Sequence, residues 1–370
     1  MANSNLSSAK KAKNDEFYTQ YHDIEKEVAA YVEFNPDVFR DKTVFLPCDD
    51  PEWSNFTKFF AQNFQSLGLK KLVSTSYAAD SKKLGAYQPS LFEMESEKYD
   101  KAKTAQKGKI YTLTGDKTGD GKIDVNDLVW NYLKGDGDFR SEEVRALRDQ
   151  ADVIITNPPF SLFREFLAWV VEADKQFVII GSKNVITYKE IFPLIKEDKM
   201  WVGATSFNKD MLFISPEEID PTQKPSTATR TVDGKVYLRS PSVWFANIDH
   251  GRRHQHLQLM SMADNLRFNK KLKGKDKYNR YHNYDAIEVP FTDAIPGDYE
   301  GLMGVPISYL DKHNPDQFEI IGSSRTLGKR MSEIAAAGSY MQGGPRFYLD
   351  NGNGTYERLY DRIVIRRCKS

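Results

Sequence analysis

Cysteine is scarce in this sequence, and long apolar runs are absent. The 370 residues include two cysteines, Cys48 and Cys368, which lie far apart in the chain. Two such distant cysteines form no disulfide framework, so we expect a cytoplasmic protein in a reducing environment. There is no apolar run of about 18 residues, the length that a membrane-spanning helix requires. The start of the chain also lacks the apolar centre of a secretory signal.

An excess of charge of either sign is also missing. The 52 Lys and Arg balance the 52 Asp and Glu, so the net charge is zero. A neutral protein has no strong non-specific affinity for nucleic acid, and any such surface must come from local clusters. One small cluster opens the chain, because residues 1–13 contain Lys10, Lys11 and Lys13 and no acid. We expect a flexible basic arm there.

The most distinctive stretch is a short apolar run that ends abruptly at two prolines. Residues 153–155 are β-branched and predict a buried strand. Asn157 is followed by Pro158 and Pro159, which cannot donate a backbone hydrogen bond, so the strand must end there in a rigid turn. Ser161 is expected to cap the helix that the periodic segment after it predicts, and Ser141 to cap an earlier helix that is expected from about Glu142.

This turn suits a planar amine. The side-chain oxygen of Asn157 and the carbonyl of Pro158 are acceptors, and Phe160 offers a flat apolar face. The amino group of adenine could give both hydrogens to these acceptors and stack its ring on Phe160. Its nitrogen would regain lone-pair character and could attack a positioned electrophilic methyl group. A plain strand-to-helix turn explains the same four letters.

Apolar strands alternate with amphipathic helices from residue 43 to about residue 203. This pattern predicts an α/β fold with a mixed, mostly parallel sheet and helices on both faces. Thr187 is expected to open a further helix with a capping box, and residues 80–134 are expected to form an insertion. The predicted strands cover residues 43–48, 72–77, 153–155, 176–181, 199–203, 242–246, 318–322 and 358–367.

The first predicted strand leads into Asp49, Asp50 and Pro51, and a helix is expected from about Glu52. In open α/β sheets such a loop binds nucleotide-like ligands. No glycine lies between Cys48 and Gly68, although cofactor-binding loops of this kind are usually rich in glycine.

Residues 116–127 have the oxygen-ligand spacing of a calcium-binding loop. Against this interpretation, the last position is Asp127 rather than Glu, the loop is single, and residues 109–114 alternate like a strand. A hairpin with a glycine-rich tip explains the same residues. We therefore predict no metal site, and a calcium-dependent docking module remains the alternative.

A basic segment follows Gly251. Residues 252–280 contain nine Lys or Arg and two acids, followed by aromatic residues. Such a segment is usually a solvated face, but beside a turn that suits a planar amine such as the amino group of adenine it favours contact with phosphates. The predicted DNA contacts are Arg252, Arg253, Lys270, Lys271, Lys273, Lys275, Lys277 and Arg280.

These motifs together resemble the EcoRI-type adenine-specific DNA methyltransferases. The resemblance is clearest at residues 15–20, 48–56, 135–141, 157–164 and 184–197. It implies a Rossmann-like fold and the transfer of a methyl group from S-adenosylmethionine to the N6 amino group of a flipped-out adenine in double-stranded DNA. Residues 14–250 would form the catalytic domain, and residues 251–370 a target-recognition region.

The resemblance also implies individual roles. Asn157 and Pro158 would orient the amino group and Phe160 would stack on the base, with Pro159 completing the motif. Asp138 would accept the amino group of the cofactor's adenine, and Phe139 would flank that ring. The other implied cofactor contacts are Phe17, Tyr18, Thr19, Asp49, Asp50 and Pro51. No acidic residue ends the second strand, so the partner of the ribose stays open.

Two alternatives of other kinds stay open. The same chemistry could act on RNA or on a protein glutamine, or the chain could be a non-catalytic DNA-binding relative. A restriction endonuclease that acts on the same DNA site is a possible functional partner, without forming a stable complex.

Overall fold

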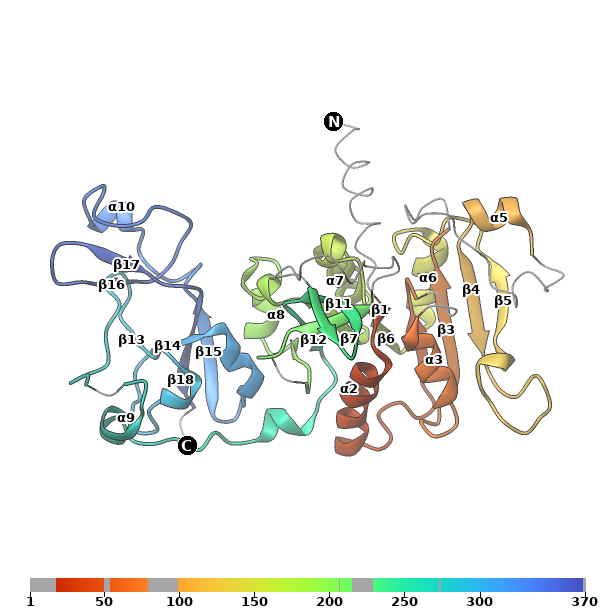
Figure 1. The fold of residues 1–370 in the computed structure, drawn as a ribbon, viewed down its shortest axis with the longest axis horizontal. Helices are drawn as coiled ribbons and strands as arrows, with labels where there is room; N and C mark the ends of the chain where they lie inside the picture. The colour runs from red at the N-terminus through yellow and green to blue at the C-terminus, as the bar shows by residue number, and fades with distance from the viewer. Residues whose placement is uncertain are drawn as a thin grey trace. The chain divides into compact units, whose positions relative to one another are not determined.

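The computed structural model describes residues 18–49, 54–78, 99–205, 207–214, 229–272 and 274–368 (Figure 1). The arm 1–13 and the predicted site residues Phe17, Asp50, Pro51 and Lys273 lie outside this part of the chain. The chain packs into two compact units, one of residues 1–183 and 202–250 and the other of residues 184–201 and 251–370. Residues 184–201 thus pack with the C-terminal region, which the sequence did not indicate.

The first unit is built on a sheet of eight strands in the order β5-β4-β3-β2-β6-β7-β12-β8. β2 pairs in parallel with β3 and β6, and β6 in parallel with β7. β4 pairs antiparallel with both β3 and β5, and β12 pairs antiparallel with β7. The strands are β2 (Thr43–Leu46), β3 (Lys71–Ser76), β4 (Lys109–Leu113), β5 (Val129–Tyr132), β6 (Val153–Thr156), β7 (Gln176–Ser182), β8 (Trp201–Val202) and β12 (Ser242–Ala246).

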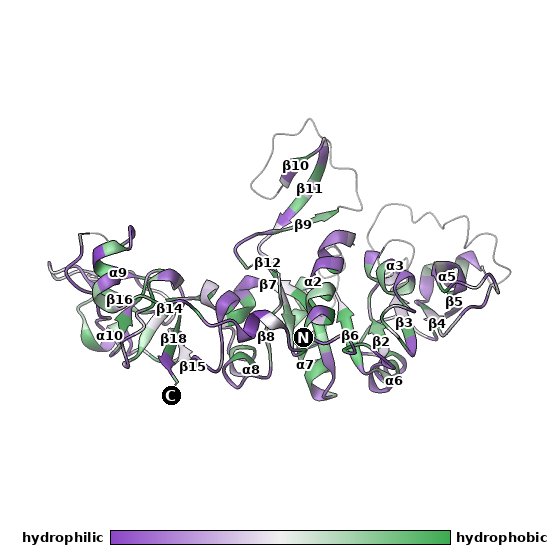
Figure 2. Ribbon diagram, turned by 90° about the horizontal axis from the view of Figure 1, so that it is seen from below, coloured by the Kyte–Doolittle hydropathy of each residue, from purple (hydrophilic) through white to green (hydrophobic). Residues whose placement is uncertain are grey.

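Helices cover both faces of this sheet, α2 and α3 on one side and α6 and α7 on the other (Figure 2). The central strands β2 and β6 are completely buried because both faces are covered. The arrangement is the α/β sheet with helices on both faces that the alternating pattern predicted, and it is consistent with the Rossmann-like fold that the resemblance implied. The sheet is mixed rather than mostly parallel, because β3–β4, β4–β5 and β7–β12 are antiparallel pairs. The helices are α2 (Tyr21–Phe34), α3 (Asn55–Gln62), α5 (Lys101–Gln106), α6 (Glu142–Gln150) and α7 (Phe163–Glu172).

Part of the segment that is expected to form an insertion contributes strands to the main sheet. β4 and β5 lie within the segment 80–134, and they extend the edge of the sheet beyond β3. Among the described residues, no helix has both the length and the apolar character needed to cross a membrane.

A second, smaller sheet of the first unit has the order β1-β9-β11-β10. All of its pairs are antiparallel, and β9, β10 and β11 stand out from the central sheet (Figure 2). Its strands are β1 (Tyr18–Thr19), β9 (Met211–Ile214), β10 (Thr229–Val232) and β11 (Lys235–Ser240).

The second unit contains a four-stranded sheet in the order β13-β14-β18-β15 and the hairpin β16-β17. Tyr281, Ala286, Phe347 and Val364 form one of its buried clusters. The strands are β13 (Ile287–Glu288), β14 (Met303–Pro306), β15 (Phe318–Ser323), β16 (Tyr348–Asp350), β17 (Tyr356–Arg358) and β18 (Arg362–Arg367); the helices are α8 (Phe192–Lys196), α9 (Met262–Phe268) and α10 (Met331–Ile334).

Two predicted helix caps are wrong, and one is confirmed. Residues 160–162 form a 3-10 turn before α7, whose N-cap is Leu162, so Ser161 caps no helix. Thr187 ends the 3-10 helix Lys183–Thr187, and α8 begins only at Phe192. Ser141 does cap α6, because its side chain accepts a hydrogen bond from the backbone of Val144.

Candidate active site

The proline turn lies at the carboxyl edge of the central sheet. β6 ends at Thr156, between the parallel strands β2 and β7, so Asn157 is the first residue beyond the sheet. Pro158 and Pro159 are buried, whereas Asn157 and Phe160 are partly exposed. The carboxyl ends of parallel strands are the usual place for a ligand in this kind of fold. The turn therefore holds its amide and its ring at the edge of the sheet where ligands bind, with the Asn157 Oδ1 atom itself buried in this structure.

Thr156 ties this turn to the loop after β2. Its hydroxyl lies 2.6 Å from Asp49 Oδ2 and 2.5 Å from the carbonyl of Pro47. The other carboxylate oxygen of Asp49 accepts a hydrogen bond of 2.7 Å from Ser54, the N-cap of α3. Asp49 is 6% exposed. It therefore acts as a buried connector between the two loops, and direct contact with a cofactor remains a prediction.

Thr19 and Phe160 are brought together through β9. The side chain of Asn55 donates a hydrogen bond of 2.8 Å to the carbonyl of Thr19. Thr19 is paired with Phe213 of β9. The ring of Phe213 meets that of Phe160 edge to face, with 6.1 Å between centroids. Thr19, one of the predicted cofactor contacts, is thus linked through β9 to the proline turn.

The loop before α6 lies at the end of β3. The backbone N–H of Ala78 donates a hydrogen bond of 2.8 Å to the carbonyl of Asp136. Gly137 has a φ of +87°, and a Cβ atom there would lie 2.3 Å from the carbonyl oxygen of Ser76. Only glycine allows this approach. The close contact places Asp138, the next residue, at the same edge of the sheet as Asn157.

Arg140 holds the carboxylate of Asp138 in place. Its Nε donates to Oδ1 over 2.9 Å, and its Nη2 donates to Oδ2 over 2.6 Å. Nη1 reaches Glu165 of α7 at 3.2 Å. The hydrogen bond with Asp138 raises the pKa of Arg140 well above its ordinary value. Since 26% of the Asp138 side chain is exposed, the carboxylate can still accept a hydrogen bond from a planar amine.

Phe139 has a packing role in the structure. It is 1% exposed, and its ring meets Phe166 and Trp169 of α7 edge to face at 5.3 and 5.6 Å. This packing anchors the loop that carries Asp138. Contact between Phe139 and the ring of a cofactor remains a prediction.

Three residues of this arrangement were not predicted. Thr156 and Arg140 each adjoin a predicted residue, and a polar residue that ends a buried strand or an arginine two positions from an aspartate could have indicated them. Phe213 lies 53 positions after Phe160. Only the folded chain reveals that contact.

The predicted DNA contacts after Gly251 differ in their surroundings. Arg253 is 7% exposed, pairs with Asp198 at 2.5 Å and stacks on Trp201 at 3.6 Å. This guanidinium supports the second unit, and we no longer count it among the phosphate contacts. Arg252 lies 3.1 Å from Asp311. Three of the predicted contacts are exposed lysines, namely Lys270, Lys275 and Lys277.

Two further predicted contacts are exposed cations with acidic neighbours. Lys271 lies 3.7 Å from Asp293 and 4.1 Å from the ring centroid of Phe291. Arg280 pairs with Asp285. Both cations stay accessible at the surface of the second unit. Their contact with DNA remains a prediction.

In the loop of residues 116–127, which has the spacing of a calcium site, carboxylates accept hydrogen bonds from the backbone of the loop itself. Asp127 accepts backbone hydrogen bonds from Lys117, Thr118 and Asp124 at 2.7 to 3.0 Å. Asp116 accepts from Gly119 and Gly121, so both acids brace the turn. Hydrogen bonds from Asp124, Thr118 and Lys117 lower the pKa of Asp127 to about 2. Within the described part of the chain, no group of three or more His, Cys, Asp or Glu residues could hold a metal ion.

Comparisons with known proteins agree over nearly the whole length. The family described as adenine-specific methyltransferase EcoRI matches residues 5–368. The Type II methyltransferase M.EcoRI of Escherichia coli is 41% identical over 318 residues, which cover 85% of this chain and 88% of that protein. M.MpnI of Mycoplasma pneumoniae is 36% identical over 360 residues, and M.MgeORF184P of Mycoplasma genitalium is 34% identical over 362 residues, each covering 97% of both chains. No solved structure matches the chain.

Proposed function

The chain belongs to the EcoRI family of adenine-specific methyltransferases and is a DNA adenine methyltransferase, and we propose that it methylates the N6 amino group of an adenine flipped out of duplex DNA. The methyl donor is S-adenosylmethionine. The position of Asn157 supports this proposal most directly. It follows a buried parallel strand, and Thr156 ties the turn to Asp49 across the sheet edge.

The chemistry of the site fits this methyl donor. A partly exposed carboxylate, Asp138, lies at the carboxyl edge of the sheet and can accept the amino group of the donor's adenine. Asn55 holds Thr19 beside the proline turn, where the methionine end of the donor would lie. The carboxylate oxygens of Asp49 accept hydrogen bonds from Ser54 and Thr156, so we assign Asp49 a positioning role.

The reaction needs orientation more than acid–base chemistry. S-adenosylmethionine supplies an electrophilic methyl group on a positively charged sulfur. Asn157 and the Pro158 carbonyl accept the two amino hydrogens, and Phe160 packs on the base. In the proposed transfer, the adenine nitrogen would form the new N–C bond, the C–S electron pair would stay on sulfur, and the surplus amino proton would leave to water. Holding the reactants in line supplies most of the acceleration.

A transfer assay with labelled S-adenosylmethionine tests the proposal. The full chain should label duplex DNA, and Asn157→Ala should lower the rate by at least about 100-fold, the size of a lost transition-state contact, while DNA binding is retained. Asn35→Ala is the matched control, because Asn35 is an exposed amide beyond the end of α2. Label in RNA or protein but not in DNA would favour the alternative substrates. If the wild type binds DNA but transfers no methyl group, a non-catalytic relative would be favoured.

The methylated sequence can be read directly. Expressing the gene in a host without adenine methylation and mapping modified bases would give the recognition site. The relatives are named Type II methyltransferases, which supports a companion restriction endonuclease in the source organism. Such an enzyme should cleave the mapped site only in DNA that this protein has not modified.

A further inference from the structure

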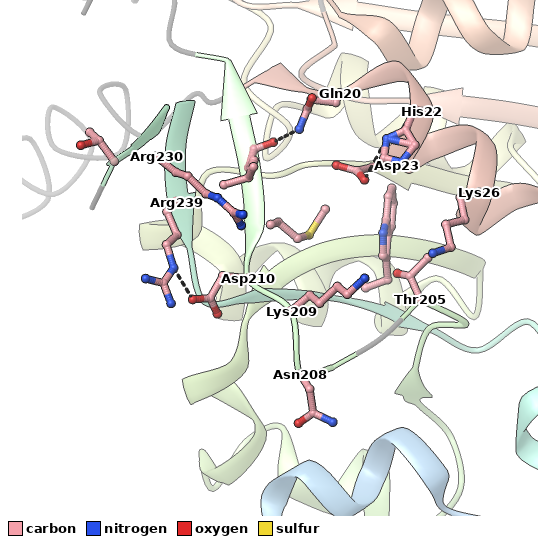
Figure 3. Close-up of a pocket in the computed structure, with 14 residues that line it drawn as sticks. Gln20, His22, Asp23, Lys26, Thr205, Asn208, Lys209, Asp210, Arg230 and Arg239 are labelled. Carbon is pink, nitrogen blue, oxygen red and sulfur yellow. Dashed lines mark hydrogen bonds and ion pairs between the residues drawn. The ribbon is translucent and has the colours of Figure 1, made fainter. Parts of the chain in front are cut away.

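A strongly polar pocket lies outside the proline turn, within the first unit. Its volume is about 730 Å³, and it opens between the start of α2 and the small sheet (Figure 3). Six charged side chains line it, namely Asp23, Lys26, Lys209, Asp210, Arg230 and Arg239. Four of the six are cations, so the pocket favours an anionic partner.

The cations exceed the acids that could neutralise them. Asp210 is shared between Arg239 at 2.7 Å and Lys183 at 3.2 Å. Within the described part of the chain, Lys26, Lys209 and Arg230 form no ion pair. Three cations, from α2, from the turn before β9 and from β10, are therefore available for anionic groups of a ligand.

The pocket adjoins the catalytic turn through β9. Phe213 of β9 packs on Phe160. The preceding residue, Leu212, lines the pocket, and its carbonyl accepts a hydrogen bond of 2.9 Å from Gln20. When a base enters the proline turn, its sugar-phosphate backbone must stay outside. Backbone phosphates on either side of that base would then lie near β9.

The wall of the pocket is fixed in place. Glu27 is completely buried and accepts backbone hydrogen bonds from Ala204 at 2.7 Å and Thr205 at 2.8 Å. Thr205 lines the pocket. A Cβ atom at Gly203 would lie 2.1 Å from Glu27, so this contact depends on glycine. The segment next to Lys209 is thus anchored to α2.

The β10–β11 hairpin extends the same charged surface. It turns tightly at Asp233 and Gly234, which both have positive φ angles. Register places Arg230 opposite Tyr237 and Val232 opposite Lys235, and strand alternation puts Arg239 on the same face. Basic side chains with an aromatic ring among them are typical of surfaces that contact nucleic acids.

We propose that Lys209, Arg230, Lys235 and Arg239, together with Lys26, bind the phosphate backbone of the DNA strand that carries the target adenine. This set is called the hairpin basic face. The inference rests on the proposed function and assigns DNA contacts to the first unit, whereas the sequence placed them only after Gly251. Phosphate contacts fix register and orientation, so this face would hold the strand while the base enters the turn.

The salt dependence of DNA binding tests this inference. A fluorescent duplex is titrated with the full chain between about 50 and 200 mM salt, and the slope of log K against log salt is measured. Arg230→Ala should reduce the magnitude of that slope by about 0.9. The double variant Arg230→Ala and Lys209→Ala should reduce it by about twice that amount. Arg230→Lys keeps the charge and should restore most of the slope.

Matched controls and a second readout separate the outcomes. Arg145→Ala on α6 and Lys70→Ala remove exposed cations elsewhere in the first unit, and they should leave the slope unchanged. In the transfer assay, the hairpin variants should raise KM for DNA and leave KM for S-adenosylmethionine unchanged. A changed KM for the methyl donor alone would assign the pocket to its carboxylate and overturn the inference.

Two other results would also overturn it. Wild-type slopes for Arg230→Ala and the double variant would mean that no phosphate contacts this face. An effect on an RNA duplex without an effect on DNA would mean that the face serves another nucleic acid. Failure of the proposed function is recognised separately, because the wild type would then transfer no methyl group to DNA whatever its binding slope.

Discussion

Thr156 and Asp49 are joined by a hydrogen bond of 2.6 Å that connects the proline turn with the loop after β2. Replacing Thr156 by Val keeps the shape but removes the donor. A buried carboxylate oxygen then loses its partner, which should lower the free energy of unfolding by about 1–3 kcal/mol. Methyl transfer should slow as well, because the turn next to Asn157 loses its anchor. Denaturant unfolding and single-turnover rates measure the two effects.

Thr75→Val is the matched control for this prediction. Thr75 of β3 is 1% exposed, and its hydroxyl has no hydrogen-bond partner among the described residues. Removing that hydroxyl should leave stability unchanged or raise it, since an unsatisfied polar group is lost. Equal destabilisation by both variants would contradict a special role for the Thr156 hydrogen bond.

The carboxylate of Asp138 should determine the affinity for the methyl donor. Asp138→Ala removes the proposed acceptor for the adenine amino group, and a hydrogen bond to a charged group contributes about 1.5–3 kcal/mol. KM for S-adenosylmethionine should therefore rise about 10- to 100-fold. Steady-state assays with saturating DNA measure this change.

Arg140→Ala tests whether orientation of that carboxylate matters. The variant keeps Asp138 but removes the bonds of 2.6 and 2.9 Å that hold it. We expect a smaller increase in KM for the methyl donor than in Asp138→Ala. Arg145→Ala, which removes an exposed arginine of the next helix, should have no effect. If KM for the methyl donor were the same in Arg140→Ala as in the wild type, Asp138 would not need Arg140 to orient its carboxylate.

Local signals in the sequence were sufficient for the centre of the fold. Residues 153–155 predicted β6, and the prolines after Asn157 correctly predicted where it ends. Ser141 correctly predicted the start of α6. In each case the decisive interaction lies within a few residues, so periodicity and capping rules apply directly.

Interactions between distant segments were not predictable in this way. The small sheet joins Thr19 with Phe213, and no local pattern indicates that pairing. Arg253 belonged to a basic segment in the sequence, yet the fold buries it against Trp201. Ser161 had a suitable position for a cap, but the rigid prolines before it impose a 3-10 turn first.

The loop of residues 116–127 should depend on pH through Asp127. Backbone hydrogen bonds, first that from Asp124, lower the folded-state pKa of Asp127 from 3.8 to about 2. Because folding lowers this pKa, the Asp127 carboxylate contributes fully to the stability of the loop when the pH is above its pKa in the unfolded chain. That contribution disappears as the pH falls through about 2. The amide NMR shifts of Thr118 and Asp124 should therefore stay constant down to about pH 4 and then titrate together.

Asp127→Asn provides the control for this titration. The variant has no ionisable group at this position, so the amide of Thr118 should lose the acid transition. Because the wild-type carboxylates already accept backbone N–H groups, a calorimetric titration with calcium should give no binding heat. Saturable heat that disappears in Asp127→Asn would contradict a self-braced hairpin and support the calcium-dependent alternative.

A buried ion pair in the second unit should respond differently to single and double replacement. Arg362 Nη2 lies 2.8 Å from Glu288 Oε1, and 12% and 6% of the two side chains are exposed. Glu288→Leu leaves a buried guanidinium without its partner and should lower the free energy of unfolding by about 3–5 kcal/mol. Adding Arg362→Met removes that charge, so the double variant should recover most of the loss. Tyr281 can then donate to the carbonyl of Gly304, already 3.2 Å away. Urea unfolding of the full chain measures this cycle, and a double variant less stable than either single one would show that the pair contributes more than the cost of burying it.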